Sequence, residues 1–158
     1  SPNNVALLKG RMKYQTIGPD KLNQLRHARM LRTVSDIERH MKRHAAILRP
    51  KFETVEKELQ KQLGDTGVAR WTTPKGGYFI SLYVLEGCAK RVEQLCANAG
   101  MILTPAGATY PYGTDPKDSN IRIAPSYPSV EEIEKASEVL ALAVRYAALE
   151  KLLSDKEN

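Results

Sequence analysis

Residues 69–84 read ARWTTPKGGYFISLYV, and this stretch decides the fold. Residues 69–73 alternate in polarity, and residues 77–84 are rich in the β-branched and aromatic residues that favour strands. The segment Pro-Lys-Gly-Gly at 74–77 lies between the two runs. Two strand-like runs joined by a short turn of this composition predict a β-hairpin.

A long amphipathic helix is predicted upstream of the hairpin. Ser35 followed by Glu38 fits a capping box, and apolar residues then recur every three or four positions until Gly64. Because Pro50 lacks the N–H of a helical hydrogen bond, we expect a kink near Ala46 within one continuous helix. The apolar stripe consists of Ile37, Met41, Ala45, Leu48, Phe52, Val55, Leu59 and Leu63.

Two shorter segments precede this helix. Residues 5–14 form a mixed segment interrupted by Gly10. Asp20 is a suitable N-cap for a helix that we expect to end near Leu31.

Further elements are predicted downstream of the hairpin. An amphipathic helix over 87–99 stops at Gly100, and short strands follow at 101–104 and 120–124. Between these strands, residues 105–119 are rich in Pro, Gly and Asp, which is typical of a loop.

The last predicted helix begins with a second capping box, Ser129 with Glu132, and is expected to reach about Leu153. More than half of its surface is apolar, so we expect a second surface to cover the part that the sheet does not.

This order of elements predicts an α+β fold, a small, mostly antiparallel sheet with helices packed on one side, preceded by the long helix. We assign residues 35–153 to this domain, residues 1–34 to a segment that connects it to another domain, and residues 154–158 to a disordered tail.

The net charge of +6 is unevenly distributed. Residues 1–61 hold 14 Lys and Arg against 6 Asp and Glu, whereas the remainder holds 10 against 12. A basic half is compatible with nucleic-acid binding. On the long helix, acidic residues are interleaved with the basic ones, and no aromatic residue is placed among them for base stacking, so a solvated helix face is the preferred interpretation. No apolar run approaches the ~20 residues of a membrane span.

The cysteines and histidines do not form a recognisable metal site. Cys88 and Cys96 lie eight residues apart on one predicted helix, too far for a disulfide, and no CxxC occurs. Two thiols without a framework fit a reducing cytoplasm. His40 and His44 share a helix face, but basic neighbours crowd them and no third ligand is near, so we predict no metal.

Arg122 is the leading candidate for chemistry. It lies mid-strand, where alternation directs it away from Ile121 and Ile123. Its planar fork suits a carboxylate bound through two parallel hydrogen bonds. From the residues alone, an outward arginine on the wet face of the sheet or an internal salt bridge is the favoured interpretation.

Four segments occur together in one order, and this order resembles class I aminotransferases, most closely the MocR-like group that includes bacterial aspartate aminotransferases. The segments are Pro74-Lys75-Gly76-Gly77-Tyr78-Phe79, Met101-Ile102-Leu103-Thr104-Pro105-Ala106-Gly107, Asn120-Ile121-Arg122-Ile123-Ala124-Pro125-Ser126, and the final capped helix.

The resemblance implies the small, C-terminal domain of a fold type I enzyme that uses pyridoxal 5'-phosphate. In that family the arginine of the Ile-Arg-Ile-Ala-like strand holds the substrate α-carboxylate, so Arg122 would take this role. Gln15, Thr16, Ile17 and Gly18 would approach the cofactor of the neighbouring subunit in a homodimer.

One departure affects catalysis. The family's Schiff-base lysine lies in a Ser-Lys segment of the large domain, and no such segment occurs here. The resemblance therefore implies that this chain alone is inactive and that catalysis needs the full-length protein. The substrates would be an amino acid, with aspartate as the best guess, and a 2-oxo acid. The alternative is a non-enzymatic aminotransferase-like domain of a transcription regulator or another binding module.

Overall fold

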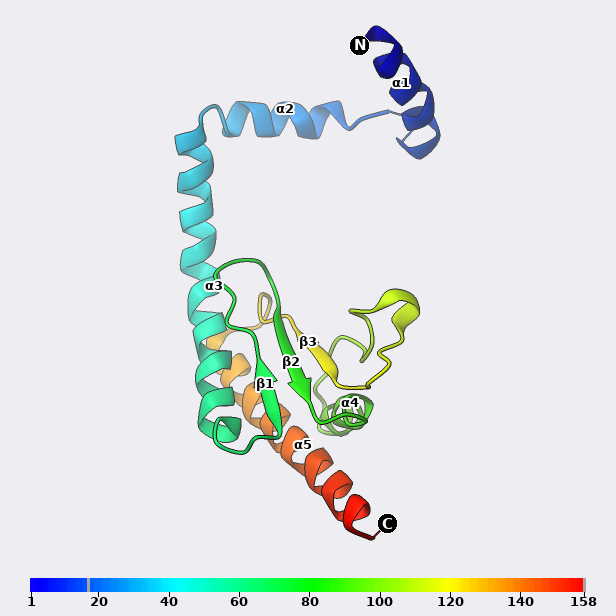
Figure 1. Cartoon of the computed structure of the whole chain (residues 1–158). Helices are drawn as coiled ribbons and strands as arrows, with labels where there is room; N and C mark the ends of the chain where they lie inside the picture. Colours follow the sequence, from blue (N-terminus) through cyan, green and yellow to red (C-terminus); the bar gives the residue numbers. More distant parts are fainter. Residues whose placement is uncertain (17, 158) are drawn as a thin grey trace. The chain divides into compact units, whose positions relative to one another are not determined.

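The computed structural model describes residues 1–16 and 18–157, which separate into two compact units, residues 1–44 and the residues from Ala45 onward. Figure 1 labels the α-helices and strands along the chain, and the short turn η1 carries no label there. They are α1 (Pro2–Thr16), α2 (Lys21–Met30), α3 (Val34–Leu63), β1 (Ala69–Trp71), β2 (Ile80–Val84), α4 (Ala89–Asn98), the 3-10 turn η1 (Pro111–Gly113), β3 (Asn120–Ile123) and α5 (Val130–Glu157).

The first unit contains α1, α2 and the start of α3, and neither α1 nor α2 has a buried residue. The mixed segment expected at 5–14 is helical throughout, so that expectation was wrong. Glycine within a helix costs only about 1 kcal/mol relative to alanine, and helix-forming residues flank Gly10 on both sides. The N-cap of α2 is confirmed, since Asp20 accepts a hydrogen bond of 2.9 Å from the Asn23 N–H.

The capping box of α3 lies two residues earlier than predicted. The Thr33 N–H donates to the Asp36 carboxylate at 3.1 Å, and the Asp36 N–H donates to the Thr33 hydroxyl at 3.2 Å. The Thr33 hydroxyl also donates to Asp36, and this hydrogen bond lowers the pKa of that carboxyl group. Both Thr33 and Ser35 open a sequence of the capping-box type, so the pattern alone did not identify the start.

α3 continues as one helix through Pro50 to Leu63, as predicted. The Thr54 hydroxyl donates a hydrogen bond of 2.8 Å to the Pro50 carbonyl group. The kink near Ala46 stays a prediction. The division into compact units falls inside α3, between His44 and Ala45, whereas the sequence suggested a boundary at the start of this helix.

The sheet of the second unit has the order β1-β2-β3, and both pairs are antiparallel. The predicted hairpin is confirmed, with Trp71 opposite Leu82, but its connection covers residues 72–79 and is longer than a four-residue turn. Thr72 partly extends the pairing, because its N–H donates to the Ser81 carbonyl and its hydroxyl accepts from the Ser81 N–H, each at 3.0 Å.

The strand expected at 101–104 is absent from the described residues, so this prediction was wrong. Met101 and Leu103 pack against the core, while Ile102 is 92% exposed. The side chains of residues 101–103 therefore alternate between partly buried and exposed, although the backbone of this segment forms no strand.

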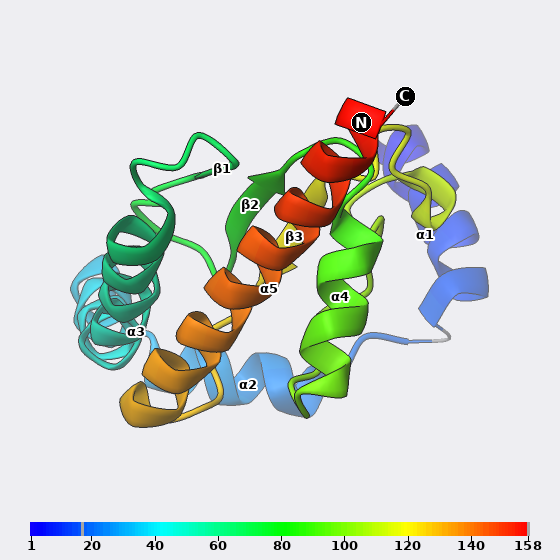
Figure 2. The ribbon, with the colours of Figure 1, turned by 90° about the horizontal axis from the view of Figure 1, so that it is seen from below.

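Helices cover one face of the sheet, as the α+β prediction required. Figure 2 shows α3, α5 and α4 side by side in front of the strands. The opposite side, here called the helix-free face, carries the strand residues Arg70, Ser81, Tyr83, Asn120 and Arg122. The core between helices and sheet includes Val55, Leu59, Leu63, Ile80, Leu82, Val92, Cys96, Ile121, Ile133, Leu140 and Val144.

The start of α5 is confirmed and its end is corrected. The Glu132 N–H donates to the Ser129 hydroxyl at 3.2 Å, and the Ser129 N–H donates to the Glu132 carboxylate at 2.7 Å. The helix continues to Glu157, where we expected a disordered tail from residue 154. No proline or glycine interrupts these residues, and the i,i+4 ion pair of Lys151 with Asp155, 3.3 Å apart, supports the last turns.

Candidate functional site

Arg122 lies on the helix-free face of the sheet, in the edge strand β3. On β3 its neighbours Ile121 and Ile123 are 1% and 8% exposed and point into the core. Successive strand residues face opposite sides, so Arg122 points the other way, where it is half-buried and lies opposite Ser81 in the β2–β3 register. The orientation predicted from alternation is therefore confirmed.

The guanidinium group of Arg122 contacts an aromatic ring instead of an acid. Its central carbon lies 4.6 Å from the centroid of the Phe79 ring. The Nε atom is buried and has no hydrogen-bond partner, and within residues 1–16 and 18–157 no carboxylate pairs with this arginine. An unpaired buried donor such as this Nε costs about 1–3 kcal/mol. Since none of the described carboxylates pairs with it, the guanidinium charge is available to an anionic partner from outside the chain.

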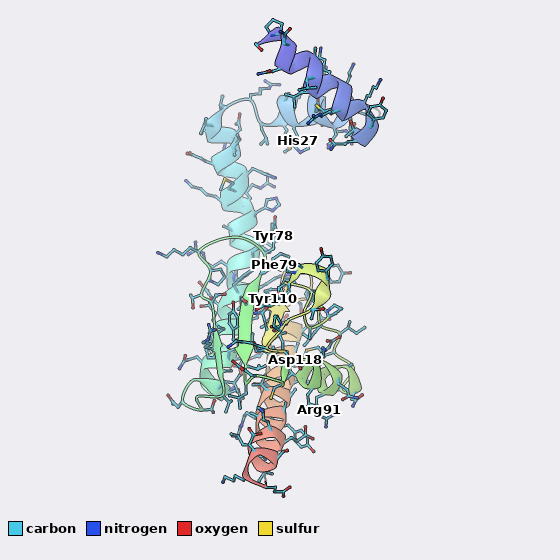
Figure 3. The ribbon with its side chains drawn as sticks, turned by 45° about the vertical axis from the view of Figure 1, so that its right-hand side comes forward. His27, Tyr78, Phe79, Arg91, Tyr110 and Asp118 are labelled. Carbon is cyan, nitrogen blue, oxygen red and sulfur yellow. The ribbon has the colours of Figure 1, made fainter. Side chains whose placement is uncertain are left out.

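The contact joins two segments that the sequence analysis had singled out separately. Phe79 ends the Pro-Lys-Gly-Gly-Tyr-Phe segment, and Arg122 lies in the Asn-Ile-Arg-Ile-Ala strand. Figure 3 shows Tyr78 and Phe79 in succession just ahead of β2. Their side chains are 53% and 49% exposed, so neither belongs to the core.

A short chain of hydrogen bonds lies beside Arg122 on the same face. The Thr109 hydroxyl donates to the Asn120 side-chain carbonyl at 2.7 Å, and the Asn120 amide donates to the Ser81 hydroxyl at 2.8 Å. Asn120 is only 3% exposed. These bonds attach the loop at 105–119 to β3, which carries Arg122, and link β3 to β2.

Asp115 organises the end of that loop. Its carboxylate accepts hydrogen bonds from the N–H groups of Lys117, Ser119 and Asn120 at 3.0, 2.8 and 2.9 Å. Partial burial opposes ionisation, but the backbone donors outweigh it and lower the pKa of Asp115. The loop therefore enters β3 in a fixed conformation, since its turn is stabilised by an ionised side chain.

Two surface hollows occur elsewhere in the second unit. One lies beside Arg70 and Tyr83, and its lining also includes Lys117. The other lies between α4 and α5, where Arg91 forms a two-pronged ion pair with Glu150 at 2.7 and 2.8 Å. Arg122 lines neither hollow.

The remaining candidates form no reactive group. His40 and His44 pack ring edge against ring face, with centroids 4.4 Å apart. No cluster of three or more His, Cys, Asp or Glu suited to a metal occurs among the described residues. Cys88 and Cys96 are free and buried, and burial raises the pKa of Cys96 to about 11. In the described part of the chain, no helix is both long and apolar enough to cross a membrane.

Gln15 and Thr16 lie at the end of α1 and are exposed. The Thr16 hydroxyl donates to the Met12 carbonyl at 3.3 Å, and Gly18 is also exposed. Ile17, the third residue of the predicted cofactor-proximal turn, lies outside the described residues. The role of this turn remains a prediction.

Comparison with known families decides the class of protein. A family model described as "Aspartate amino-transferase" matches residues 1–156. The chain belongs to this aminotransferase family. This confirms the resemblance inferred from the four segments.

Individual relatives agree with this assignment. The aminotransferase chain is 46% identical over 150 residues to an aspartate aminotransferase of Corynebacterium glutamicum, an alignment that covers 95% of this chain and 35% of the relative. It also matches the crystal structure of an aspartate transaminase from C. glutamicum with a TM-score of 0.88 and 46% identity, covering 96% of this chain and 36% of that one. The chain thus spans about a third of the length of these relatives.

A more distant structure shares the fold. LysN, an α-aminoadipate aminotransferase from Thermus thermophilus crystallised with N-(5'-phosphopyridoxyl)-L-leucine, matches with a TM-score of 0.75 at 18% identity. The match covers 93% of the aminotransferase chain and 36% of LysN.

The sequence did not reveal which residues surround Arg122. Phe79 was part of a recognised segment but had no assigned role, and Thr109 and Asn120 had none either. One signal was present, since Asn120 shares the strand face of Arg122 two residues away, and a polar pair on one face often forms a network.

Proposed function

We propose that this chain is the small, C-terminal domain of a pyridoxal-phosphate-dependent aminotransferase and that Arg122 binds the substrate α-carboxylate. The observation that carries this proposal is the guanidinium group of Arg122, half-buried, with an unpartnered Nε and no paired carboxylate among the described residues. Arginine is rarely left in this state unless a partner arrives from outside the domain.

In the proposed reaction Arg122 positions the substrate and moves no proton. Two parallel N–H···O bonds to the α-carboxylate fix both the position and the plane of that group. Such a clamp limits rotation of the amino acid, so the Cα–H bond is held toward the catalytic base. The partly buried setting strengthens each hydrogen bond relative to bulk water.

Aspartate is the proposed amino donor and a 2-oxo acid the acceptor. The names aspartate aminotransferase and aspartate transaminase, given to the matched sequence and the matched crystal structure from C. glutamicum, support this choice. Arg122 itself recognises only the carboxylate common to all α-amino acids. The residues that select the aspartate side chain would then lie outside the site described here.

We infer that the covalent cofactor position lies outside this chain, since its sequence lacks the Ser-Lys segment that carries the lysine in the resembling family. That position needs a lysine with a lowered pKa and a phosphate cradle. Lys61 and Lys117 have raised pKa values because they donate hydrogen bonds to Glu58 and Glu86, respectively. Lys51 donates to the backbone carbonyl groups of residues 126 and 127. Pyridoxal phosphate, which supplies the electron sink of such reactions, would therefore be held by the rest of the full-length protein.

We further propose a cytoplasmic homodimer in which Gln15 and Thr16 approach the cofactor of the neighbouring subunit. Their exposure at the end of α1 is compatible with such a contact. Residues 1–34 would lead into the domain that binds the cofactor, and residues 35–153 would form the small domain.

The test is an assay of the purified full-length protein with aspartate and a 2-oxo acid, read by product formation and by the absorbance of bound pyridoxal phosphate. The expected result is transamination of aspartate and no reaction with ethylamine, which lacks the carboxylate. Absence of both activity and bound cofactor, together with specific DNA binding, would instead support a regulator.

A further inference from the structure

We propose that Phe79 is the positioning residue for Arg122: its ring stacks on the guanidinium group and holds the fork in the orientation that receives the carboxylate. This inference rests on the proposed function of Arg122 and extends it to a residue in the connection between β1 and β2.

The first support is the geometry of the contact. The guanidinium carbon lies 4.6 Å from the ring centroid, well inside the ~6 Å over which a cation and an aromatic face attract each other. Stacking leaves the edge of the guanidinium plane, where the N–H groups point, free for a ligand.

The second support is the lack of an acidic partner for Arg122 among the described residues. The Arg122 Nε has no hydrogen-bond partner, and within the part of the chain that the structure describes no carboxylate pairs with the guanidinium group. A long side chain without an anchor would sample many rotamers, and ordering it on binding would weaken the affinity for the carboxylate. The Phe79 ring is the contact that limits this freedom.

The third support is the placement of Phe79 itself. Its side chain is 49% exposed and is not among the residues that pack against the core. A half-exposed phenylalanine contributes less to the core than a buried one, and its ring contacts the Arg122 guanidinium group. It directly precedes Ile80, which pairs with Ile123, the neighbour of Arg122.

The backbone before Phe79 is adapted to this placement. Gly77 has a φ of +91°, a conformation that side-chain-bearing residues rarely adopt. It turns the chain just before Tyr78 and Phe79. The segment thus presents two adjacent aromatic rings at the end of the sheet, of which Phe79 stacks on Arg122.

A double-mutant cycle in the full-length enzyme tests the proposal. We expect Phe79→Leu to lower kcat/KM for aspartate about tenfold, mainly through a higher KM, since the clamp is weakened but not removed. Phe79→Tyr should recover most of this loss because it keeps the aromatic face. In an Arg122→Ala background, Phe79→Leu should change kcat/KM less than about twofold, since the group that it positions is absent.

The matched control is Tyr78→Leu, because Tyr78 is adjacent, aromatic and equally exposed. It should stay within about twofold of the parent. The Kd of succinate, an unreactive dicarboxylate, gives a second readout, and Phe79→Leu should raise it while leaving the cofactor absorbance unchanged.

The outcomes separate the two proposals. If Arg122→Ala lowers kcat/KM strongly but the Phe79→Leu effect is undiminished in its background, the positioning role is wrong while the proposed function stands. An effect of Tyr78→Leu equal to that of Phe79→Leu, or no effect of Phe79→Leu, also overturns it. If Arg122→Ala itself has no effect, the proposed function fails, and the inference fails with it.

Discussion

Asn120 donates a hydrogen bond of 2.8 Å to Ser81, the residue that lies opposite Arg122 in the β2–β3 register. The same buried amide accepts from Thr109, so a single side chain of β3 connects the loop at 105–119 to the neighbouring strand β2. The position of Arg122 therefore depends on a polar network beside it as well as on the apolar core beneath the sheet.

Removal of this connection should destabilise the chain. We expect Asn120→Ala to lower the free energy of unfolding by about 1–3 kcal/mol, since it leaves buried polar groups without partners. Denaturant unfolding of the chain measures the change. Thr109→Val is the matched variant and breaks the same network. The double variant should therefore lose less unfolding free energy than the sum of the losses in Thr109→Val and Asn120→Ala. Full additivity would show that Thr109 and Asn120 act separately.

The lowered pKa of Asp115 predicts that the folded chain loses stability in acid. Its pKa is lowered in the folded chain, so its contribution is complete above the ordinary value of 3.8 and is lost as the pH falls through the lowered folded value. Asp115→Ala should therefore reduce stability at neutral pH and flatten the acid limb of the curve. Unfolding free energies measured between neutral pH and strong acid test this, and an unchanged acid limb in the variant would contradict it.

The two serine-initiated capping sequences should differ in their effect on stability. Ser129 exchanges hydrogen bonds with Glu132, whereas Thr33 and Asp36 take this role at the start of α3, ahead of Ser35. Ser129→Ala should therefore lower the free energy of unfolding by about 1 kcal/mol. Ser35→Ala, the matched control, should change it by less than about 0.5 kcal/mol. Equal losses would show that Ser35 also caps α3.

The isolated 158-residue chain should catalyse no transamination. It should also give no stable absorbance band of a covalently bound cofactor when mixed with pyridoxal phosphate, since the sequence lacks the Ser-Lys segment expected to carry the cofactor lysine. The assay of the full-length protein serves as the positive control. Turnover by the chain alone would show that the cofactor lysine had been missed.

Local patterns predicted most of the elements and the orientation of Arg122. Alternation around Ile121 and Ile123 was sufficient to direct the arginine away from the core, and the Ser129 capping box marked the start of α5. Such signals depend on residues close together in the chain, so they can be read without knowing the fold.

Contacts between distant segments were not predictable in this way. The contact of Phe79 with Arg122 depends on the register of β2 with β3. A local ambiguity also arose at the start of α3, where Thr33 and Ser35 both fit the capping pattern and Thr33 forms the capping hydrogen bond. The alternation of Met101 and Leu103 indicated a strand, but it reflected burial alone.

The most direct test of the account compares two arginines on the helix-free face in the full-length enzyme. Arg122 stacks on Phe79, and Arg70 stacks on Tyr83 at 3.9 Å, so the two share residue type, sheet face and an aromatic contact. Arg122→Ala should cost about 3–5 kcal/mol of transition-state stabilisation, because the substrate carboxylate loses a two-pronged charged partner. Arg122→Lys should recover only part of this loss, since an ammonium group cannot form the fork.

The measurement is kcat/KM for aspartate in Arg122→Ala, Arg122→Lys and Arg70→Ala. The account predicts a fall of at least about a hundredfold for Arg122→Ala, a smaller fall for Arg122→Lys, and a value for Arg70→Ala within about threefold of the parent. Values for both Arg122 variants within about threefold of the parent would contradict the assignment of Arg122 as the carboxylate-binding residue.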